Sequence, residues 1–270
     1  MAYVNATNNY ATSRYIVNST AGKGNYTTIA SAITQAAADG GGDVFIMAGT
    51  YTENLTMVAG VNLVCDTASY TSLSTIILGT LTCNYTGTCS ISGICLQTNG
   101  AAAITSTTTQ ATTLYLEDCL IFCNNSIGIT VNNPSFYMRL YECRASSTGN
   151  IALYTFTSIG EVHFVACDFQ ITGGISNFSN VATGLVRYLA CKSNYPVSTT
   201  STGILDMENT YMDSNSANSI FVQTAGSATS YISSSTIVSG TGSAIKIGSG
   251  TTIIINYLVI SSSNSTKIVS

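Results

Sequence analysis

The chain has 270 residues, of which 45% are hydrophobic and only 7% are charged, and its formal net charge at pH 7 is −4. This composition excludes intrinsic disorder, which goes with high charge, and argues against nucleic acid as the main partner. No run of 18 apolar residues is present, so no membrane-spanning helix is expected. No basic and apolar leader is visible at the start, so no secretory signal is expected either.

The first two segments differ from the rest of the chain. Residues 1–25 are polar, rich in Asn and Tyr and without periodicity, and they are predicted to be an arm or attachment segment. Residues 27–39 have apolar residues at helical spacing, with Thr27 or Thr28 able to cap the start and Gly40 ending the segment. The apolar residues of this segment are Ile29, Ala32, Ile33 and Ala36. A short amphipathic helix here is expected to cap the first coil of residues 26–270.

Five cysteines recur at a constant interval of 24 residues. They are Cys95, Cys119, Cys143, Cys167 and Cys191. A fixed period of this size is typical of a solenoid, in which each repeat is one coil stacked on the last. Around each cysteine, apolar residues alternate with polar ones as in a half-buried strand, and the two residues before it break the alternation like a tight turn. The sequence therefore predicts an all-β, right-handed parallel β-helix of about ten coils in one domain.

Stacking the repeats predicts columns of inward side chains. The columns are Leu114, Met138, Val162 and Val186; Leu116, Leu140, Phe164 and Tyr188; the cysteines; and Ile121, Ala145, Phe169 and Ser193. Residues 65–94 cannot be phased, and Ala101–Thr113 is either a strand or a loop. Beyond residue 194 the cysteine position is expected at Thr210, Thr236 and Tyr257, and no helix is expected to cap the last coil.

The opening of this region resembles a known family. The residues that carry the resemblance are Tyr26-Thr-Thr-Ile29, Ala32-Ile33, Val44-Phe-Ile, Gly49-Thr-Tyr51 and Glu53-Asn-Leu55. They are similar to the first coils of pectin-lyase-like right-handed β-helices, including pectin methylesterases and phage tailspike and fibre proteins. Pectin methylesterases need two aspartates and an arginine, one aspartate in a motif like Gly-x-Val-Asp-Phe-Ile-Phe-Gly. The nearest match, Gly160 to Cys167, has His163 at the aspartate position, so the resemblance implies the fold and not the activity.

The candidate ligand or interface residues share one outward column. They are Tyr115, Arg139, His163 and Arg187. This column is interpreted either as a contact for an anion or acidic sugar, as a subunit interface, or as a solvated face relieved by Glu117 and Glu161. A neighbouring column of Leu120, Arg144, Asp168 and Lys192 is expected to form a ladder of ion pairs.

Two acidic groups are weaker candidates. Asp118 and Glu142 are expected one coil apart at a turn, where two carboxylates could serve acid–base chemistry. Asp206, Glu208 and Asp213 could hold a hard cation loosely. No cofactor and no metal site are predicted.

The nine cysteines are expected to be buried free thiols, which indicates folding in a reducing compartment. A pair between Cys83 and Cys89 stays open as an alternative.

The favoured hypothesis is a non-enzymatic structural or adhesive protein, such as a virion tail fibre or spike or an extracellular filament, assembled as a trimer or higher species and binding cell-surface glycans. The first alternative is a carbohydrate-active enzyme, an esterase, lyase or glycosidase. The second is a carbohydrate-binding module that uses Tyr115, Tyr141 and the Arg139 column.

Overall fold

The structure is a computed structural model that describes residues 14–20, 25–65, 74–149, 152–171, 179–214, 221–224, 228–240, 243–262 and 268–269. One helix and a 25-stranded parallel sheet account for the regular elements of these residues. The elements are β1 (Tyr15–Val17), α1 (Ile29–Ala38), β2 (Gly42–Ile46), β3 (Gly49–Thr52), β4 (Leu55–Thr56), β5 (Val61–Cys65), β6 (Thr75–Leu78), β7 (Leu81–Thr82), β8 (Gly87–Ser92), β9 (Cys95–Asn99), β10 (Ile104–Ser106), β11 (Thr112–Glu117), β12 (Leu120–Asn124), β13 (Ile129–Tyr141), β14 (Arg144–Ser147), β15 (Tyr154–Val165), β16 (Asp168–Ile171), β17 (Ser179–Leu189), β18 (Lys192–Ser193), β19 (Val197–Glu208), β20 (Tyr211–Ser214), β21 (Phe221–Gln223), β22 (Thr229–Ser239), β23 (Ile245–Ile247), β24 (Thr252–Ser262) and β25 (Ile268–Val269).

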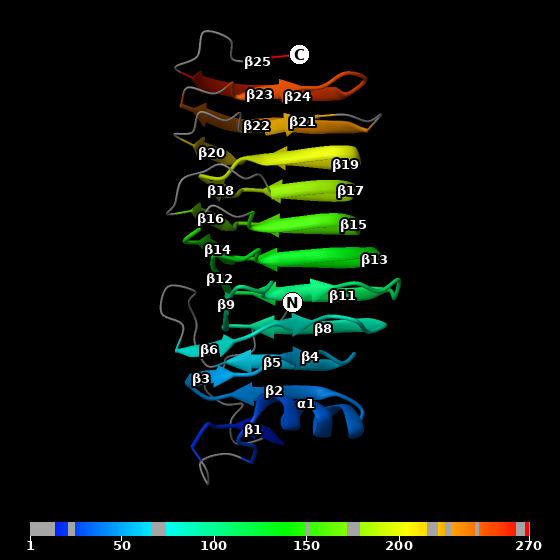
Figure 1. Ribbon diagram of the computed structural model, residues 1–270, viewed down its shortest axis with the longest axis vertical. Coiled ribbons are helices and arrows are strands. Elements are labelled where there is room, and N and C mark those ends of the chain that lie inside the picture. The colour runs from blue at the N-terminus through cyan, green and yellow to red at the C-terminus, as the bar shows by residue number, and fades with distance from the viewer. Residues whose placement is uncertain are drawn as a thin grey trace.

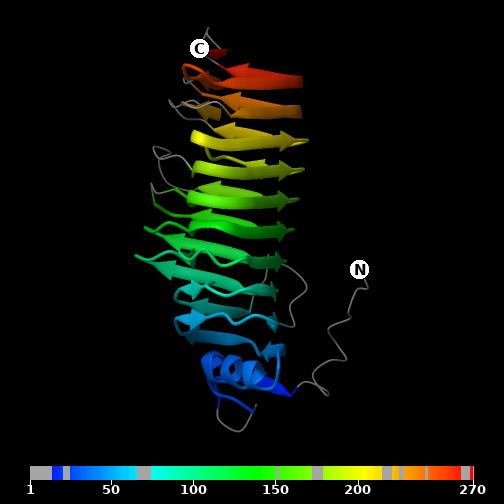
Figure 2. The same cartoon turned by 90° about the vertical axis from the view of Figure 1, so that its right-hand side faces the viewer.

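The strands stack into an elongated rod with α1 at one end (Figures 1 and 2). Each turn of the chain runs along three sides of the rod, and a long strand can cover two of them. We call these the first sheet, which contains β11, the second sheet, which contains β12, and the third sheet, which contains β10. The long strands β13, β15, β17 and β19 start in the third sheet and end in the first. The described residues form a solenoid of about eight turns, slightly fewer than the ten or so coils expected.

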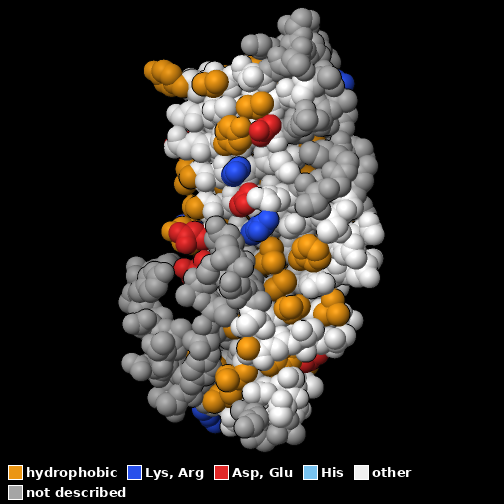
Figure 3. Space-filling model, turned by 90° about the vertical axis from the view of Figure 1, so that its left-hand side faces the viewer, with side chains coloured by type: hydrophobic (Ala, Val, Ile, Leu, Met, Phe, Trp, Pro, Cys, Tyr) orange, Lys and Arg blue, Asp and Glu red, His pale blue; other side chains and the backbone are white. Residues whose placement is uncertain are grey.

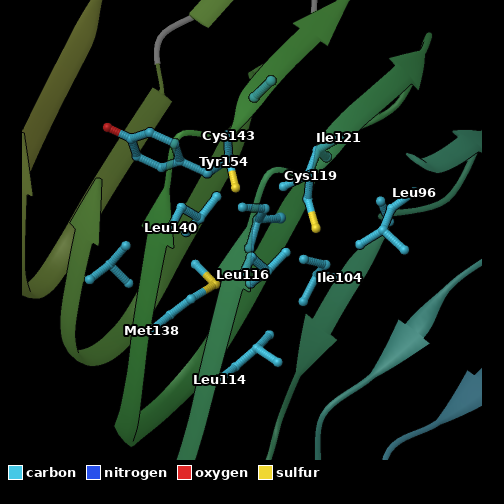
Figure 4. Close-up of a cluster of buried hydrophobic side chains, with 14 of the residues drawn as sticks. Leu96, Ile104, Leu114, Leu116, Cys119, Ile121, Met138, Leu140, Cys143 and Tyr154 are labelled. Carbon is cyan, nitrogen blue, oxygen red and sulfur yellow. The ribbon is translucent and has the colours of Figure 1, made fainter. Parts of the chain in front are cut away.

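The predicted inward columns are confirmed by the strand register. Leu116 pairs with Leu140, Leu140 with Phe164 and Phe164 with Tyr188, and all four are buried. Figure 4 shows the layers of this core, with side chains of successive turns lying over one another. Because one turn cannot enclose its own apolar side chains, the core is closed only by the turns above and below.

The turn predicted before each cysteine is a left-handed corner between the first and second sheets. In eight successive turns, starting with the corner between β8 and β9, one residue has positive φ there, between 48° and 72°. These residues are Gly93, Asp118, Glu142, Ala166, Ala190, Asn209, Ser234 and Tyr257. Such a conformation reverses the alternation of side chains, which is why the apolar pattern breaks at this place in every repeat.

The cysteine column holds for four of its five members. In each turn, the residue that follows the cysteine position donates its backbone N–H to the carbonyl of the residue at the cysteine position in the previous turn. Arg144, for example, donates to Cys119 at 2.9 Å. The corresponding bond from Leu120 goes to Ile94, so Ile94 lies beneath Cys119, and Cys95 pairs with Leu120 instead. The expectation for Cys95 is therefore wrong by one residue.

Beyond Cys191 the column runs through Thr210, Ser235 and Leu258. The positions expected at Thr236 and Tyr257 are also one residue out. Insertions and deletions in the loops change the number of residues in a turn. Residues at equal intervals in the sequence then do not occupy equivalent positions in successive turns.

All nine cysteines are buried and free, which includes Cys83 and Cys89. Burial raises the pKa of the Cys143 and Cys167 thiols well above the ordinary value. These thiols therefore stay protonated and pack as small apolar groups.

The start of the rod differs from the prediction in one respect. Part of the expected arm of residues 1–25 belongs to the solenoid, because Tyr15–Val17 pairs with β2 and Tyr15 is buried. The arm expectation for residues 1–13 and 21–24 lies outside the described residues. The helix prediction is confirmed, with Thr28 as the N-cap and Asp39 as the C-cap.

The segments that could not be phased are resolved as strands. Residues 65–94 contain β6, β7 and β8, and residues 101–113 contain β10 and the start of β11.

At the other end of the rod, the inward residues of β24 are only partly buried. Two other apolar residues of this strand, Ile254 and Val259, are 41% and 62% exposed. In the described part of the chain, no helix has the length and apolar content that crossing a membrane requires.

Candidate functional site

The first sheet places the predicted candidate residues on successive rungs of its outward face. Tyr115 pairs with Arg139, Arg139 with His163, and His163 with Arg187. The column continues to Asp206. Since stacked strands lie about 4.8 Å apart, the two arginines are separated by only about 10 Å with the histidine between them. We call Arg139, His163 and Arg187 the cation ladder.

His163 is paired with Glu161, which the sequence analysis named only as a charge near this column. Its Nε2 forms a very short hydrogen bond with Oε1 of Glu161, two residues earlier on β15. Residues i and i+2 of a strand face the same side, so this spacing is the signal that could have revealed the pair. The His163 side chain is 20% exposed and that of Glu161 is 37% exposed. The carboxylate orients the imidazole ring, as in a positioned acid–base group.

Arg187 and Arg139 differ in their electrostatic surroundings. Arg187 Nε donates to Asp206 Oδ2 at 2.8 Å, so its charge is largely balanced. Arg139 forms no ion pair or hydrogen bond with any described residue, and its Nε is buried without a partner. The Arg139 guanidinium is half-buried and has donors that no described residue uses, so they are free to bind solvent or a ligand.

Tyr137 lies beside the cation ladder, and its ring contacts the rings of His163 and Tyr115. Its ring centroid is 5.5 Å from that of His163 and 6.1 Å from that of Tyr115, in edge-on arrangements. Burial raises the pKa of Tyr137, and nearby Tyr115 and Glu161 raise it further, against smaller opposing effects of the arginines. The Tyr137 hydroxyl is therefore protonated at neutral pH and can donate a hydrogen bond or a proton.

The acidic pair predicted at the turn is brought together by the structure. Asp118 and Glu142 occupy the left-handed corner on adjacent turns. Burial raises the pKa of Asp118, and the negative charges of Glu142 and Glu117 raise it further. Two like charges at a corner are what a solvated turn would also show, and no described group points to a role for them in chemistry.

The other charged candidates are arranged differently from the prediction. The second-sheet column of Arg144, Asp168 and Lys192 is in register, but it forms no ion pair among the described residues. The acidic patch is divided between two sheets, since Asp206 binds Arg187 while Asp213 accepts a hydrogen bond from Tyr211 at 3.0 Å. Within the described ranges, no three metal-binding side chains gather in one place.

Solved structures share this architecture. Pectin methylesterase PemA from Erwinia chrysanthemi has a TM-score of 0.52 and 14% identity, over 86% of this chain and 80% of that chain. The fold is that of a pectin-lyase-like β-helix. Pectin methylesterases from Aspergillus niger and carrot are also similar to this β-helix, with TM-scores of 0.46 and 0.41 and identities of 14% and 12%. They cover 94% of this chain in both cases, and 86% and 84% of their own chains. No family model matches the β-helix, and no curated protein matches it in sequence.

These comparisons correct one expectation. PemA, which shares the fold, is an enzyme, and this finding contradicts the hypothesis of a non-enzymatic protein. The identity is low, so the likeness shows the fold and leaves the chemistry to the residues of this chain. Assembly into a trimer or filament, a place on a virion or extracellular surface, and glycan binding stay predictions.

Proposed function

We propose that the protein is a carbohydrate-active enzyme that binds an acidic polysaccharide on the cation ladder and cleaves it by β-elimination. The observation that carries this proposal is the unpartnered guanidinium of Arg139, one rung from the paired His163 and Glu161. The β-helix fold shared with pectin methylesterases supports a sugar acid as the ligand.

The first role is anion binding by Arg139. A sugar carboxylate is planar and has two acceptor oxygens, which suit the fork of donors that a guanidinium presents. Arg187 already has Asp206, so Arg139 is the cation that gains most from a ligand. The acidic corner formed by Asp118 and Glu142 follows the same strands and repels an anionic chain, which confines the chain to the ladder.

The second role is proton transfer. In β-elimination, a base removes the hydrogen from the ring carbon that bears the carboxylate. The electron pair of that C–H bond forms a double bond to the next ring carbon, and the glycosidic C–O bond at that carbon breaks. We assign the base to the His163–Glu161 pair and the proton donor for the leaving oxygen to Tyr137. Arg139 stabilises the negative charge that develops on the carboxylate in the transition state.

Hydrolytic chemistry is less well supported by the same face. Glycoside hydrolysis uses two free carboxylates, but Glu161 binds His163 and Asp206 binds Arg187. An esterase of the serine type needs a nucleophile hydrogen-bonded to its base, and in the described part of the chain no hydroxyl or thiol bonds to His163. In the nearest local match to the pectin methylesterase motif, His163 stands at the position of the aspartate.

The test uses polygalacturonate and alginate as acidic polymers and dextran as a neutral one. The new double bond is followed by its ultraviolet absorbance, and binding is measured separately by isothermal titration calorimetry. We expect turnover of at least one acidic polymer and none of dextran. His163→Ala should lower kcat about 100-fold or more while binding persists. Arg139→Ala should weaken binding about 10- to 100-fold.

Lys246→Ala is the matched control, because Lys246 is an exposed cation on β23 of the third sheet. It should leave binding and turnover unchanged. Binding without any double-bond product would show a binding module and refute the enzymatic part. The whole proposal would be refuted if the protein neither bound nor cleaved either acidic polymer. It would also be refuted if Lys246→Ala weakened binding as much as Arg139→Ala.

A further inference from the structure

A bend follows strand β9 at the corner between the second and third sheets. It contains Asn99-Gly100, and no other asparagine of the chain is followed by glycine. Asn99, Gly100 and Ala101 are all exposed. Thr98 Oγ1 donates to the carbonyl oxygen of Ala101 at 2.7 Å, which closes the bend. The bend therefore presents an asparagine side chain, and the peptide bond that follows it, to solvent.

Two groups of this bend that can react with each other are not held by the fold. Neither the Asn99 carboxamide nor the Gly100 N–H forms a hydrogen bond with a described residue. The Asn62 carboxamide, by contrast, donates to Asp43 Oδ1 at 2.8 Å and accepts from the Ser90 N–H at 2.9 Å. Gly100 has a φ of +89°, which residues with a Cβ rarely adopt, and the missing Cβ leaves its nitrogen open to approach.

The Asn99 side chain borders a recess of about 300 Å³. The recess spans three turns of the rod, with Asn54 on the first, Thr80 on the second and Asn99 on the third. None of the described residues that line it is charged. Water can therefore reach the Asn99 carboxamide, and the side chain has room to turn toward the main chain.

The connection that contains Asn99 is longer than its counterpart on the previous turn. Gln97 pairs with Leu78, and Ile104 pairs with Leu81. Six residues separate Gln97 from Ile104, whereas two residues separate Leu78 from Leu81. Connections of this kind tolerate added length at little cost. A small change in backbone length after Asn99 therefore leaves the pairing of β9 and β10 in place.

We propose that Asn99 is a site of spontaneous deamidation, in which water is the only other reactant. The Gly100 nitrogen attacks Cγ of Asn99 and gives up its proton. A C–N bond forms and closes a cyclic imide, the bond from Cγ to the side-chain nitrogen breaks, and ammonia leaves with the proton. Water then adds to one of the two imide carbonyl groups and opens the ring. Opening at Cγ gives aspartate, and opening at the main-chain carbonyl gives isoaspartate.

Either product carries a carboxylate where the recess had an amide, so one negative charge is added to a chain whose formal net charge is −4. Figure 3 views the rod from the side on which β14, β16 and β18 lie in Figure 1, and most of this surface carries neither red nor blue side chains. Isoaspartate also lengthens the main chain by one atom, which the long connection takes up. The rod thus keeps its fold while the recess becomes anionic. This site does not rest on the function proposed for the cation ladder.

The test incubates the full chain in mildly alkaline buffer and follows each asparagine by mass spectrometry after digestion with pepsin, whose acidic conditions stop the reaction. We expect Asn99 to convert first, with the aspartate and isoaspartate peptides separated by chromatography. Asn62 should react at least about 10-fold more slowly, because its two hydrogen bonds must break first. The circular dichroism spectrum should stay unchanged while the product accumulates.

A parallel incubation in urea separates the effect of the fold from that of the sequence. Because the fold leaves Asn99 free, its rate should rise less than about 10-fold on unfolding, whereas the rate of Asn62 should rise by more than that. Asn99→Gln is the matched control, since the longer side chain keeps the amide but closes the ring poorly. This variant should lack the early product and fold as the parent chain does.

The proposal would be overturned if the Asn99 peptide kept its amide as long as the Asn62 peptide does. An acceleration of Asn99 in urea as large as that of Asn62 would overturn it too, because the fold would then protect both residues alike. Loss of the circular dichroism signal in step with deamidation would contradict the inference that the long connection absorbs the change.

Discussion

Glu53 anchors the helix that covers the first turn of the rod, and its removal should open that end. Both carboxylate oxygens accept a backbone hydrogen bond, from the N–H of Ile29 and the N–H of Ala30, each at 2.9 Å. The first N–H groups of a helix have no partner within the helix and carry the positive end of its dipole. One carboxylate thus satisfies two such groups and balances their charge.

The size of the effect follows from these contacts. A hydrogen bond to a charged group contributes about 1.5–3 kcal/mol when desolvated and less when exposed. The bond to Ile29 is partly buried and the bond to Ala30 is exposed, so we assign about 1.5 and about 0.5 kcal/mol. The helix dipole adds roughly 0.5 kcal/mol. We therefore expect Glu53→Ala to destabilise the helix by about 2–3 kcal/mol.

Hydrogen exchange is the appropriate assay, because a solenoid can unfold locally at one end. In Glu53→Ala the amides of α1 should exchange about 30- to 150-fold faster, while those of β15 keep their rates. Thr28→Ala is the comparison, since the Thr28 side chain accepts only one exposed bond, of 3.3 Å from Ser31, and should have a smaller effect. Unchanged exchange in Glu53→Ala, or a larger effect of Thr28→Ala, would refute the reasoning.

Two further predictions concern the corners and the close approach of turns. The raised pKa of Asp118 means that the fold favours its protonated form, so its contribution to stability is present at acid pH and lost as pH rises through that pKa. Asp118→Asn should therefore raise Tm at pH 7 more than at pH 3, and an equal shift at both would contradict this. Gly184→Ala should destabilise by at least about 2 kcal/mol more than Gly100→Ala, in urea unfolding. Both glycines have φ near +90°, but only at Gly184 would a Cβ lie 2.0 Å from the Ile159 carbonyl oxygen, so equal effects would be inconsistent with the packing.

The period of the sequence was enough to predict the interior of the rod. Stacked strands put like positions over one another, so the columns through Leu116 and through Ile121 follow from counting. The same counting failed at Cys95, where Ile94 takes the place beneath Cys119. The interval between two cysteines in the sequence is the sum of the strand and loop lengths between them. It therefore does not reveal that a loop has gained one residue.

The candidate site could be predicted only in part. The sequence register places Arg139, His163 and Arg187 on one face, because alternation in a strand decides which side chains point outward. It does not decide which of them find partners within the chain. That Glu161 pairs with His163 while Arg139 stays without an acceptor depends on side-chain conformations, which carry no periodic signal.

The left-handed corner accommodates different residue types. Residues as different as Gly93, Glu142, Ala190 and Tyr257 share one backbone conformation there, and Tyr257 is 90% exposed. From Asp118 onward the corner residues have side chains, which follow one another along the rod at a spacing of about 4.8 Å per turn. Substitution at these corners should leave the layers of the interior in place where the new residue tolerates positive φ, as asparagine and aspartate do. The row of corners offers an engineer a molecular ruler on which chemical groups can be mounted at a fixed spacing.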